Sequence, residues 1–169
     1  DLYAGREDYL AALNWVAEHG ASIGIDTTRL AIGGDSAGGN MSAAVAQENL
    51  RRGGPNLQMQ VLVYPATNLL AEFPSKEENG QGYFMSADFM NSLGPLIEKG
   101  ADLTDPWLSP GLTEDLSGLP PALILTAGFD PIRDDGLCYT AQLREAGIAP
   151  VVHVQAIVDH RSEERRVGK

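Results

Sequence analysis

The sequence is poor in the residues that build disulfides, metal centres and membrane spans. Among its 169 residues there is one cysteine, Cys138, and there are three histidines, His19, His153 and His160. A single cysteine cannot close an internal disulfide or supply a cysteine-rich metal site. No apolar run approaches the roughly 18 residues that a membrane-spanning helix needs. We therefore predict neither an internal disulfide, nor a metal cluster, nor a membrane span.

Positive charge is also scarce. The 12 lysines and arginines stand against 23 aspartates and glutamates, which gives a formal net charge of −11. A protein that binds the phosphate backbone needs the opposite balance, so nucleic acid is not an expected partner. Hydrophobic residues make up 43 % of the chain and charged residues 21 %, an ordinary globular composition. The length suits one domain with a substantial core.

Both ends of the sequence are unusual. The chain begins at Asp1 without an initiator methionine or an apolar leader, and we expect it to be the C-terminal piece of a longer protein. The expected compartment is the cytoplasm, with a targeting segment ahead of Asp1 left open. Residues 161–169 turn abruptly to charge and resemble the in-frame translation of a sequencing-library adapter, so we expect a non-native tail. A solvated basic tail is the alternative.

Hydrophobic periodicity predicts alternating helices and strands. Helices are expected over 7–19 and 37–52. A third is expected after Ser86, with Met90, Leu93 and Ile97 on one side. A fourth is expected to begin at a cap, Asp134 or Asp135, and to end at Gly147. Strands are expected over 29–33, 59–64, 122–127 and from 151 to about 158. The strand at 122–127 is apolar at nearly every position, which is typical of parallel strands covered on both faces. The pattern predicts an α/β protein, a mostly parallel sheet flanked by helices.

The strongest chemical signal lies between the first predicted strand and the helix that follows it. Gly34-Asp35-Ser36-Ala37-Gly38 has the Gly-x-Ser-x-Gly pattern of a nucleophile elbow, a sharp turn that lifts a serine hydroxyl clear of the sheet. Side chains two residues on either side of Ser36 should collide with the turn, so we expect Gly34 and Gly38 to be required. The backbone N–H of Ala37, at the helix N-terminus, is placed to stabilise an oxyanion.

Other interpretations of this motif are less well supported. A plain strand-to-helix turn is the simplest of them. A phosphate-binding loop would need a Gly-Lys-Ser or Gly-Lys-Thr ending, which is absent. Gly-Asp-Ser also resembles the nucleophile region of chymotrypsin-like proteases, but those are all-β proteins, whereas an alanine-rich helix pattern follows Ser36.

The longer string Gly-Asp-Ser-Ala-Gly-Gly resembles the hormone-sensitive-lipase branch of the α/β-hydrolases, microbial carboxylesterases among them. The resemblance runs from about residue 8 to 160 and includes the strings at 26–31, 63–65, 116–122 and 130–134. It implies that residues 1–160 are the C-terminal part of a partial α/β-hydrolase catalytic domain. A lid-contributing insertion is then expected at roughly 68–110.

The resemblance also implies a catalytic triad. Its acid falls on Asp130, the first Asp of an Asp-Pro-Ile-Arg-Asp string, which directly follows the strand at 122–127. The rival acids Asp134 and Asp135 are interpreted as helix caps. The chain order Ser, Asp, His then selects His160 as the base. His19, on a helix before Ser36, and His153, within a strand, are expected to be structural.

The implied chemistry is ester hydrolysis through an acyl-enzyme, with Ser36 as nucleophile, His160 as general base and Asp130 orienting the imidazole. The expected partner is a small-molecule ester with a short acyl chain, and no metal or organic cofactor is required. Two alternatives share the same residues, a non-catalytic small-molecule receptor and an amidase. The oligomeric state is left open.

Three further expectations follow from the resemblance. The family's His-Gly-Gly loop, which supplies most oxyanion donors, would lie before Asp1, so this chain alone should hydrolyse little or no ester. A truncated sheet would expose an unpaired apolar strand edge, and we expect poor solubility. Residues 82–85, with Phe89 and Met90, resemble lid residues that touch the acyl chain, although core packing is an equal alternative.

Overall fold

The computed structural model describes residues 2–86, 88, 90, 94, 100–148 and 151–160, and these build one four-stranded parallel sheet in the order β1-β2-β3-β4. The strands are β1 (Leu30–Asp35), β2 (Leu57–Val63), β3 (Ala122–Phe129) and β4 (Val151–Asp159). The helices are α1 (Leu2–His19), α2 (Ala37–Arg51), α3 (Pro74–Glu78) and α5 (Arg133–Glu145), with short 3-10 turns η1 (Gly20–Ile23) and η2 (Pro110–Leu112). The predicted α/β class is confirmed.

Each predicted strand is present, and the predicted helices over 7–19 and 37–52 are found with shifted ends. Helix α1 begins five residues earlier than expected, at Leu2. Helix α3 was not predicted. Its five residues are too few to show a helical hydrophobic period, but Pro74 at the first helical position is a start signal. Most of the helix expected after Ser86, with Leu93 and Ile97, lies outside the described residues.

The prediction that Asp134 or Asp135 caps the last helix is wrong. Helix α5 begins at Arg133, and its N-cap residue, Ile132, makes no side-chain cap hydrogen bond. Both aspartates lie inside the first turn and their carboxylates face other segments. Asp134 Oδ2 accepts the backbone N–H of Ser75 at 3.0 Å, and Asp135 Oδ1 accepts that of Asn68 at 2.8 Å. Both carboxylates therefore accept backbone N–H groups of distant segments instead of capping α5, and Asp134 Oδ1 also accepts Arg133 Nε at 2.8 Å.

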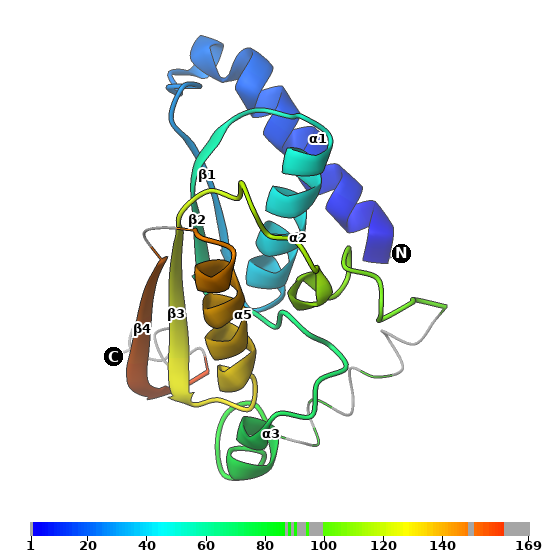
Figure 1. Ribbon diagram of the computed structural model, residues 1–169, viewed down its shortest axis with the longest axis vertical. Coiled ribbons are helices and arrows are strands. Elements are labelled where there is room, and N and C mark those ends of the chain that lie inside the picture. The colour runs from blue at the N-terminus through cyan, green and yellow to red at the C-terminus, as the bar shows by residue number, and fades with distance from the viewer. Residues whose placement is uncertain are drawn as a thin grey trace.

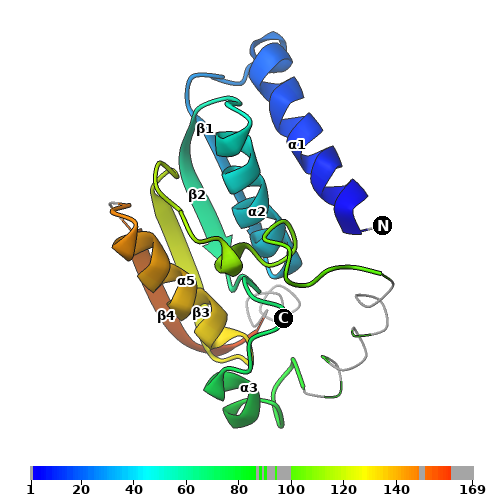
Figure 2. The same ribbon diagram turned by 45° about the vertical axis from the view of Figure 1, so that its right-hand side comes forward.

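Helices α2 and α5 pack on one face of the sheet, and α1 packs on the outer side of α2 (Figures 1 and 2). Alanines of α2 let that helix approach the strands closely, and larger side chains fill the space between α2 and α5. Tyr139 of α5, fully buried, accepts a hydrogen bond on its hydroxyl from Gln47 Nε2 of α2 at 2.9 Å. The core comprises mainly Leu10, Leu30, Ile32, Ala43, Val45, Ala46, Leu57, Leu62, Ala122, Ile124, Tyr139 and Leu143.

Apolar side chains also line the opposite face of the sheet. The strand register places two rows across it, Val61–Leu123–Val152 and Val63–Leu125–Val154. We call these six residues the open face. Val152 and Val154 are 46 % and 45 % exposed, and the other four are partly buried. Among the described residues, helical cover is thus found on one face, whereas the apolar strand pattern predicts cover on both.

The open face should make this chain self-associate. We expect the double substitution Val152→Thr and Val154→Thr, which keeps β-branched shape but adds hydroxyls, to lower binding of an apolar dye and raise the soluble monomer fraction in sedimentation velocity. Leu70→Thr is the matched control, because Leu70 is 46 % exposed but lies in a loop away from the sheet. Equal improvement by the control variant would count against the open face as the cause.

Candidate active site

The carboxyl ends of the parallel strands bring four residues to one edge of the sheet. Ser36 follows β1, Tyr64 follows β2, Asp130 follows β3 and His160 follows β4, each as the first residue after its strand. The register pairs the neighbouring strand ends, with Asp35 opposite Val63 and Phe129 opposite Asp159. Ligands of open α/β sheets bind at this edge, so it is where a site is expected.

Ser36 occupies a strained backbone conformation. Its φ of 53° and ψ of −117° lie outside the regions that serine favours. Hydrogen bonds on both sides hold it there, because its N–H donates to Val63 O at 2.9 Å and its carbonyl accepts from Asn40 N at 3.0 Å. The Ser36 side chain makes no cap hydrogen bond to α2, so its hydroxyl is not engaged by the helix it precedes. Ala37 is the first residue of that helix.

The two glycines of the motif differ in what they permit. A Cβ at Gly34 would lie 2.6 Å from the carbonyl carbon and oxygen of Gly38, so a side chain there cannot be accommodated without moving backbone. A Cβ at Gly38 would meet nothing within 4 Å in the described structure. The expected collision is therefore found at Gly34 but not at Gly38. Of these two glycines, contact between the strand end and the first helical turn restricts only Gly34.

His160 lies between Ser36 and Asp130 and is within hydrogen-bond distance of both. Its Nδ1 is 2.6 Å from Asp130 Oδ2, and its Nε2 is 3.1 Å from Ser36 Oγ. A carboxylate accepts hydrogen bonds, so Nδ1 carries the proton and the Nε2 lone pair faces the serine hydroxyl. His160 is 1 % exposed and Asp130 is fully buried. The second carboxylate oxygen of Asp130 accepts the backbone N–H of Ile132 at 3.0 Å.

Tyr64 is a site residue for which the sequence indicated no role. Its ring lies 4.3 Å from that of His160, centroid to centroid, at an interplanar angle of 54°. The tyrosine is 5 % exposed and has a positive φ of 35°, an unusual conformation for a bulky residue. Its N–H donates to Leu125 O at 2.6 Å, which ties it to β3. The Tyr-Pro pair directly after a buried strand is the signal that could have indicated a constrained turn.

Asp135 is a second buried carboxylate close to Asp130. It is 1 % exposed, and its Oδ2 has no hydrogen-bond partner among the described residues. Burial raises the pKa of Asp135 to about 7, and the nearby Asp130 adds to this increase, whereas the Asn68 N–H and Lys76 oppose it. The side chain therefore holds a proton under mildly acidic conditions, unlike an ordinary aspartate.

The other two histidines lie apart from this cluster. His19 is exposed at the end of α1. Its ring and that of Trp15 meet edge to face, with centroids 5.4 Å apart. His153 in β4 is partly buried, with its Nε2 2.8 Å from Thr126 Oγ1, and burial lowers its pKa. The described residues contain no group of three or more His, Cys, Asp or Glu side chains arranged to hold a metal ion. None of the described helices combines the length and apolar character needed to cross a bilayer.

Aromatic side chains stand beside the cluster, on the segment whose sequence resembles a lid. Tyr83 stacks on Phe129, the residue before Asp130, with ring centroids 5.1 Å apart. Phe84 is 54 % exposed, whereas Met85 is 5 % exposed and belongs to the packed interior. Phe89 lies outside the described residues. The segment therefore combines core packing at Met85 with exposed aromatic surface.

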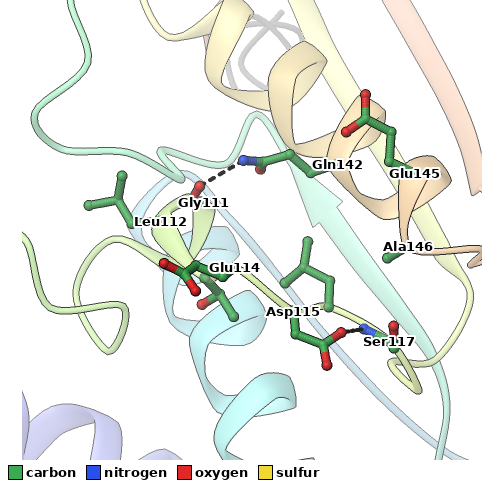
Figure 3. A pocket seen from close by; sticks show the side chains of 10 residues that line it. Gly111, Leu112, Glu114, Asp115, Ser117, Gln142, Glu145 and Ala146 are labelled. Atoms are coloured by element: carbon green, nitrogen blue, oxygen red, sulfur yellow. Dashed lines mark hydrogen bonds between the residues drawn. The ribbon is translucent and has the colours of Figure 1, made fainter.

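One surface hollow lies away from this cluster. About 560 Å³ in volume, it is bounded by residues 111–117 and the end of α5, and contains none of Ser36, Asp130 and His160 (Figure 3). Gln142 Nε2 donates to Gly111 O at 2.8 Å and Ser117 N donates to Asp115 Oδ1 at 2.9 Å across its walls. The hollow is open and acidic, and nothing in its lining resembles a nucleophile with a base.

A family model described as alpha/beta hydrolase fold matches residues 2–162, and the chain belongs to this family. Carboxylesterase NlhH of Mycobacterium tuberculosis is 44 % identical over 151 residues, 86 % of this chain and 47 % of the relative. Esterase LipI of the same organism is 41 % identical, covering 89 % of this chain and 48 % of the relative. The chain thus spans about half the length of the curated relatives it matches.

Solved structures give the same result. A thermostable esterase from Pseudomonas putida superposes with a TM-score of 0.88 at 38 % identity, over 92 % of this chain and 50 % of the esterase. The sheet and its flanking helices therefore have the architecture of a solved esterase. Fold similarity alone does not assign the chemistry, which has to be argued from the site.

The asymmetry of the two motif glycines is testable by unfolding in urea. We expect Gly34→Ala to destabilise the chain by about 1–3 kcal/mol or more, because the new Cβ meets backbone that cannot move aside. Gly38→Ala, the matched control in the first turn of α2, should be neutral or stabilising by up to about 1 kcal/mol. Equal losses at both positions would contradict the geometry.

The buried Asp135 predicts a pH-dependent difference in stability. The native state holds its proton up to pH about 7, whereas an unfolded aspartate releases it near 3.8, so wild-type stability should fall as pH rises through this window. Relative to wild type, Asp135→Asn should gain stability by up to about 1.4 kcal/mol per pH unit across the window and hold the gain above it. Chemical denaturation at pH 4 and pH 8 measures this.

The control for that experiment is Asp115→Asn. Hydrogen bonds from Ser117 lower the pKa of the Asp115 carboxyl, which is the opposite shift. The substitution should therefore bring no gain at pH 8. A pH-independent effect of Asp135→Asn would show that the buried carboxyl does not hold its proton.

Proposed function

We propose that the protein containing this chain is a serine carboxylesterase that hydrolyses short-chain acyl esters. The observation that supports this most directly is the hydrogen-bonded series Ser36 Oγ, His160 Nε2, His160 Nδ1 and Asp130 Oδ2, with separations of 3.1 and 2.6 Å between neighbouring side chains. Membership of the alpha/beta hydrolase fold family and two relatives named as esterases support the same reaction class.

In the first half of the reaction, Ser36 Oγ attacks the ester carbonyl while its proton passes to His160 Nε2. The carbonyl oxygen takes up the negative charge as the tetrahedral centre forms. The N–H of Ala37, at the positive end of α2, donates to that oxyanion. His160 then gives its proton to the departing alkoxide, which leaves as the alcohol, and the acyl group remains on Ser36.

In the second half, water attacks the acyl-enzyme. His160 Nε2 takes a proton from the water as its oxygen adds to the acyl carbon, and the second tetrahedral centre collapses as the bond to Ser36 Oγ breaks. Ser36 recovers its proton from His160, and the carboxylic acid is released. Asp130 keeps the imidazole in the required tautomer, a role that suits a buried carboxyl group held by both His160 Nδ1 and Ile132 N.

Residues 1–160 are proposed to be the C-terminal part of the catalytic domain, with a lid-contributing insertion at about 68–110 and a non-native tail at 161–169. Ala37 is the single oxyanion donor that the sequence motif supplies, and the other donors are expected from the His-Gly-Gly loop before Asp1. Loss of one such donor costs about 10² to 10³ in rate. We therefore expect the 169-residue chain alone to hydrolyse a p-nitrophenyl ester far more slowly than a full-length protein.

Replacing Ser36 by Ala in the full-length protein tests the proposal. Hydrolysis of p-nitrophenyl butyrate should fall by about 10⁴-fold or more, and labelling by a fluorophosphonate probe should disappear. Ser42→Ala is the matched control on the same helix, since Ser42 is fully buried and its hydroxyl has no partner among the described residues. This variant should keep wild-type activity and labelling.

Three results would change the assignment. Wild-type protein that binds esters without hydrolysing or reacting with the probe would be a receptor. Faster turnover of a butyryl anilide than of the matching ester would make it an amidase. Hydrolysis that survives Ser36→Ala would place the nucleophile elsewhere.

A further inference from the structure

Helix α3 is fastened to the turn that carries Asp130. Ser75 Oγ donates to Pro131 O at 2.7 Å, and Asn79 Nδ2 donates to Asp130 O at 3.3 Å. The backbone N–H of Ser75 also donates to Asp134 Oδ2 at 3.0 Å. In both ribbon views α3 lies beyond the carboxyl end of β3, where this turn begins (Figures 1 and 2).

These hydrogen bonds are shielded from solvent. Ser75 is fully buried and Asn79 is 4 % exposed. The residues whose carbonyls they bind, Pro131 and Asp130, are buried as well. Water cannot replace a lost donor at such a position, so without Ser75 Oγ the Pro131 carbonyl would have to move or stay unpaired. A buried serine and a buried asparagine are costly in an apolar environment, and here both are directed at the backbone of one turn.

An ion pair reinforces the attachment at the surface. Arg133 Nη2 donates to Glu78 Oε2 at 2.8 Å, while its Nε donates to Asp134 Oδ1 at 2.8 Å. Asp134 N also donates to Ser75 Oγ at 3.3 Å. Four of the five residues from Asp130 to Asp134 are thus in contact with the short segment from Ser75 to Asn79.

The direction of the Asp130 carboxylate depends on this backbone. One oxygen pairs with His160 Nδ1 at 2.6 Å and the other accepts Ile132 N, a group of the same turn. The carboxylate is therefore fixed relative to residues 130–132, and a shift of the turn would move it relative to His160. A displacement of about 1 Å is large compared with the tolerance of a hydrogen bond and costs up to roughly a hundredfold in rate.

We propose that Ser75 and Asn79 are positioning residues that hold the Asp130 turn in the place from which Asp130 orients His160. This inference rests on the proposed function, since it gives α3 a part in the Ser36, His160 and Asp130 reaction. Neither residue touches the reacting atoms, and both act through the backbone carbonyls that they bind. The segment that follows α3 carries Tyr83, whose ring stacks on Phe129 directly before the same turn.

The test compares Ser75→Ala and Asn79→Ala with wild type in the full-length protein. Glu77→Gln is the matched control, because Glu77 lies exposed on the same helix. We expect kcat on p-nitrophenyl butyrate to fall roughly tenfold to a hundredfold in both alanine variants, with KM within about twofold of wild type. The control should match wild type.

A second measurement does not depend on turnover. The proton on His160 Nδ1 gives a downfield NMR signal while it is held by Asp130, assigned by its loss in His160→Asn. In the alanine variants this signal should shift or broaden, whereas Glu77→Gln should leave it unchanged. Asn79→Ala is the milder change, because the Asp130 carbonyl keeps the Arg133 N–H at 3.0 Å, and this variant keeps the test valid if Ser75→Ala does not fold.

The outcomes separate the two proposals. Folded alanine variants with wild-type kcat and an unchanged His160 signal would overturn the positioning role while the esterase assignment stands. A loss confined to KM would also overturn it, because it would place Ser75 and Asn79 in substrate binding. Wild-type protein without esterase activity would refute the proposed function, and the NMR comparison would still decide whether α3 holds the Asp130 turn.

Discussion

Parallel pairing of the four strands is the constraint on which the site depends. Because the strands run in one direction and are in register, their last residues reach a common edge, and the chain leaves that edge at Ser36, Tyr64, Asp130 and His160. None of these four needs a long loop to approach the others. The packing of α2 and α5 against one face keeps the strands in place, so the core of the domain sets the geometry of the cluster.

Two neighbouring buried carboxylates show how environment assigns different roles to one residue type. Asp130 has a partner on each oxygen, the imidazole of His160 and the N–H of Ile132, and such partners stabilise a negative charge. One oxygen of the Asp135 carboxyl accepts Asn68 N, the other has no hydrogen-bond partner among the described residues, and burial raises the pKa of this group to about 7. The four residues between them include the start of α5, so both positions are determined by one short turn.

Much of this could be predicted from the sequence, because the informative patterns are local. Strand periodicity, the glycine at position 34 and the order of Ser36, Asp130 and His160 are all visible without a structure. The capping prediction for Asp134 and Asp135 was wrong because an aspartate near a helix start can either cap that helix or accept a hydrogen bond from a distant segment, and the sequence does not distinguish the two. Their partners, Ser75 and Asn68, lie 59 and 67 residues away. The contact of Tyr64 with His160 was missed for the same reason, since sequence shows no distance between strands.

The separation of these contacts along the chain also has a consequence for folding. Ser36 and His160 are 124 residues apart, and His160 follows β4, which pairs with β3 at one end of the described sheet. Contacts of such long range form late, since the entropy of closing the intervening loop is lost before the contact contributes. During synthesis, the strained Ser36 turn can be complete before His160 has been made. The hydrogen bond between Ser36 and His160 therefore forms only after β4 has joined the described sheet.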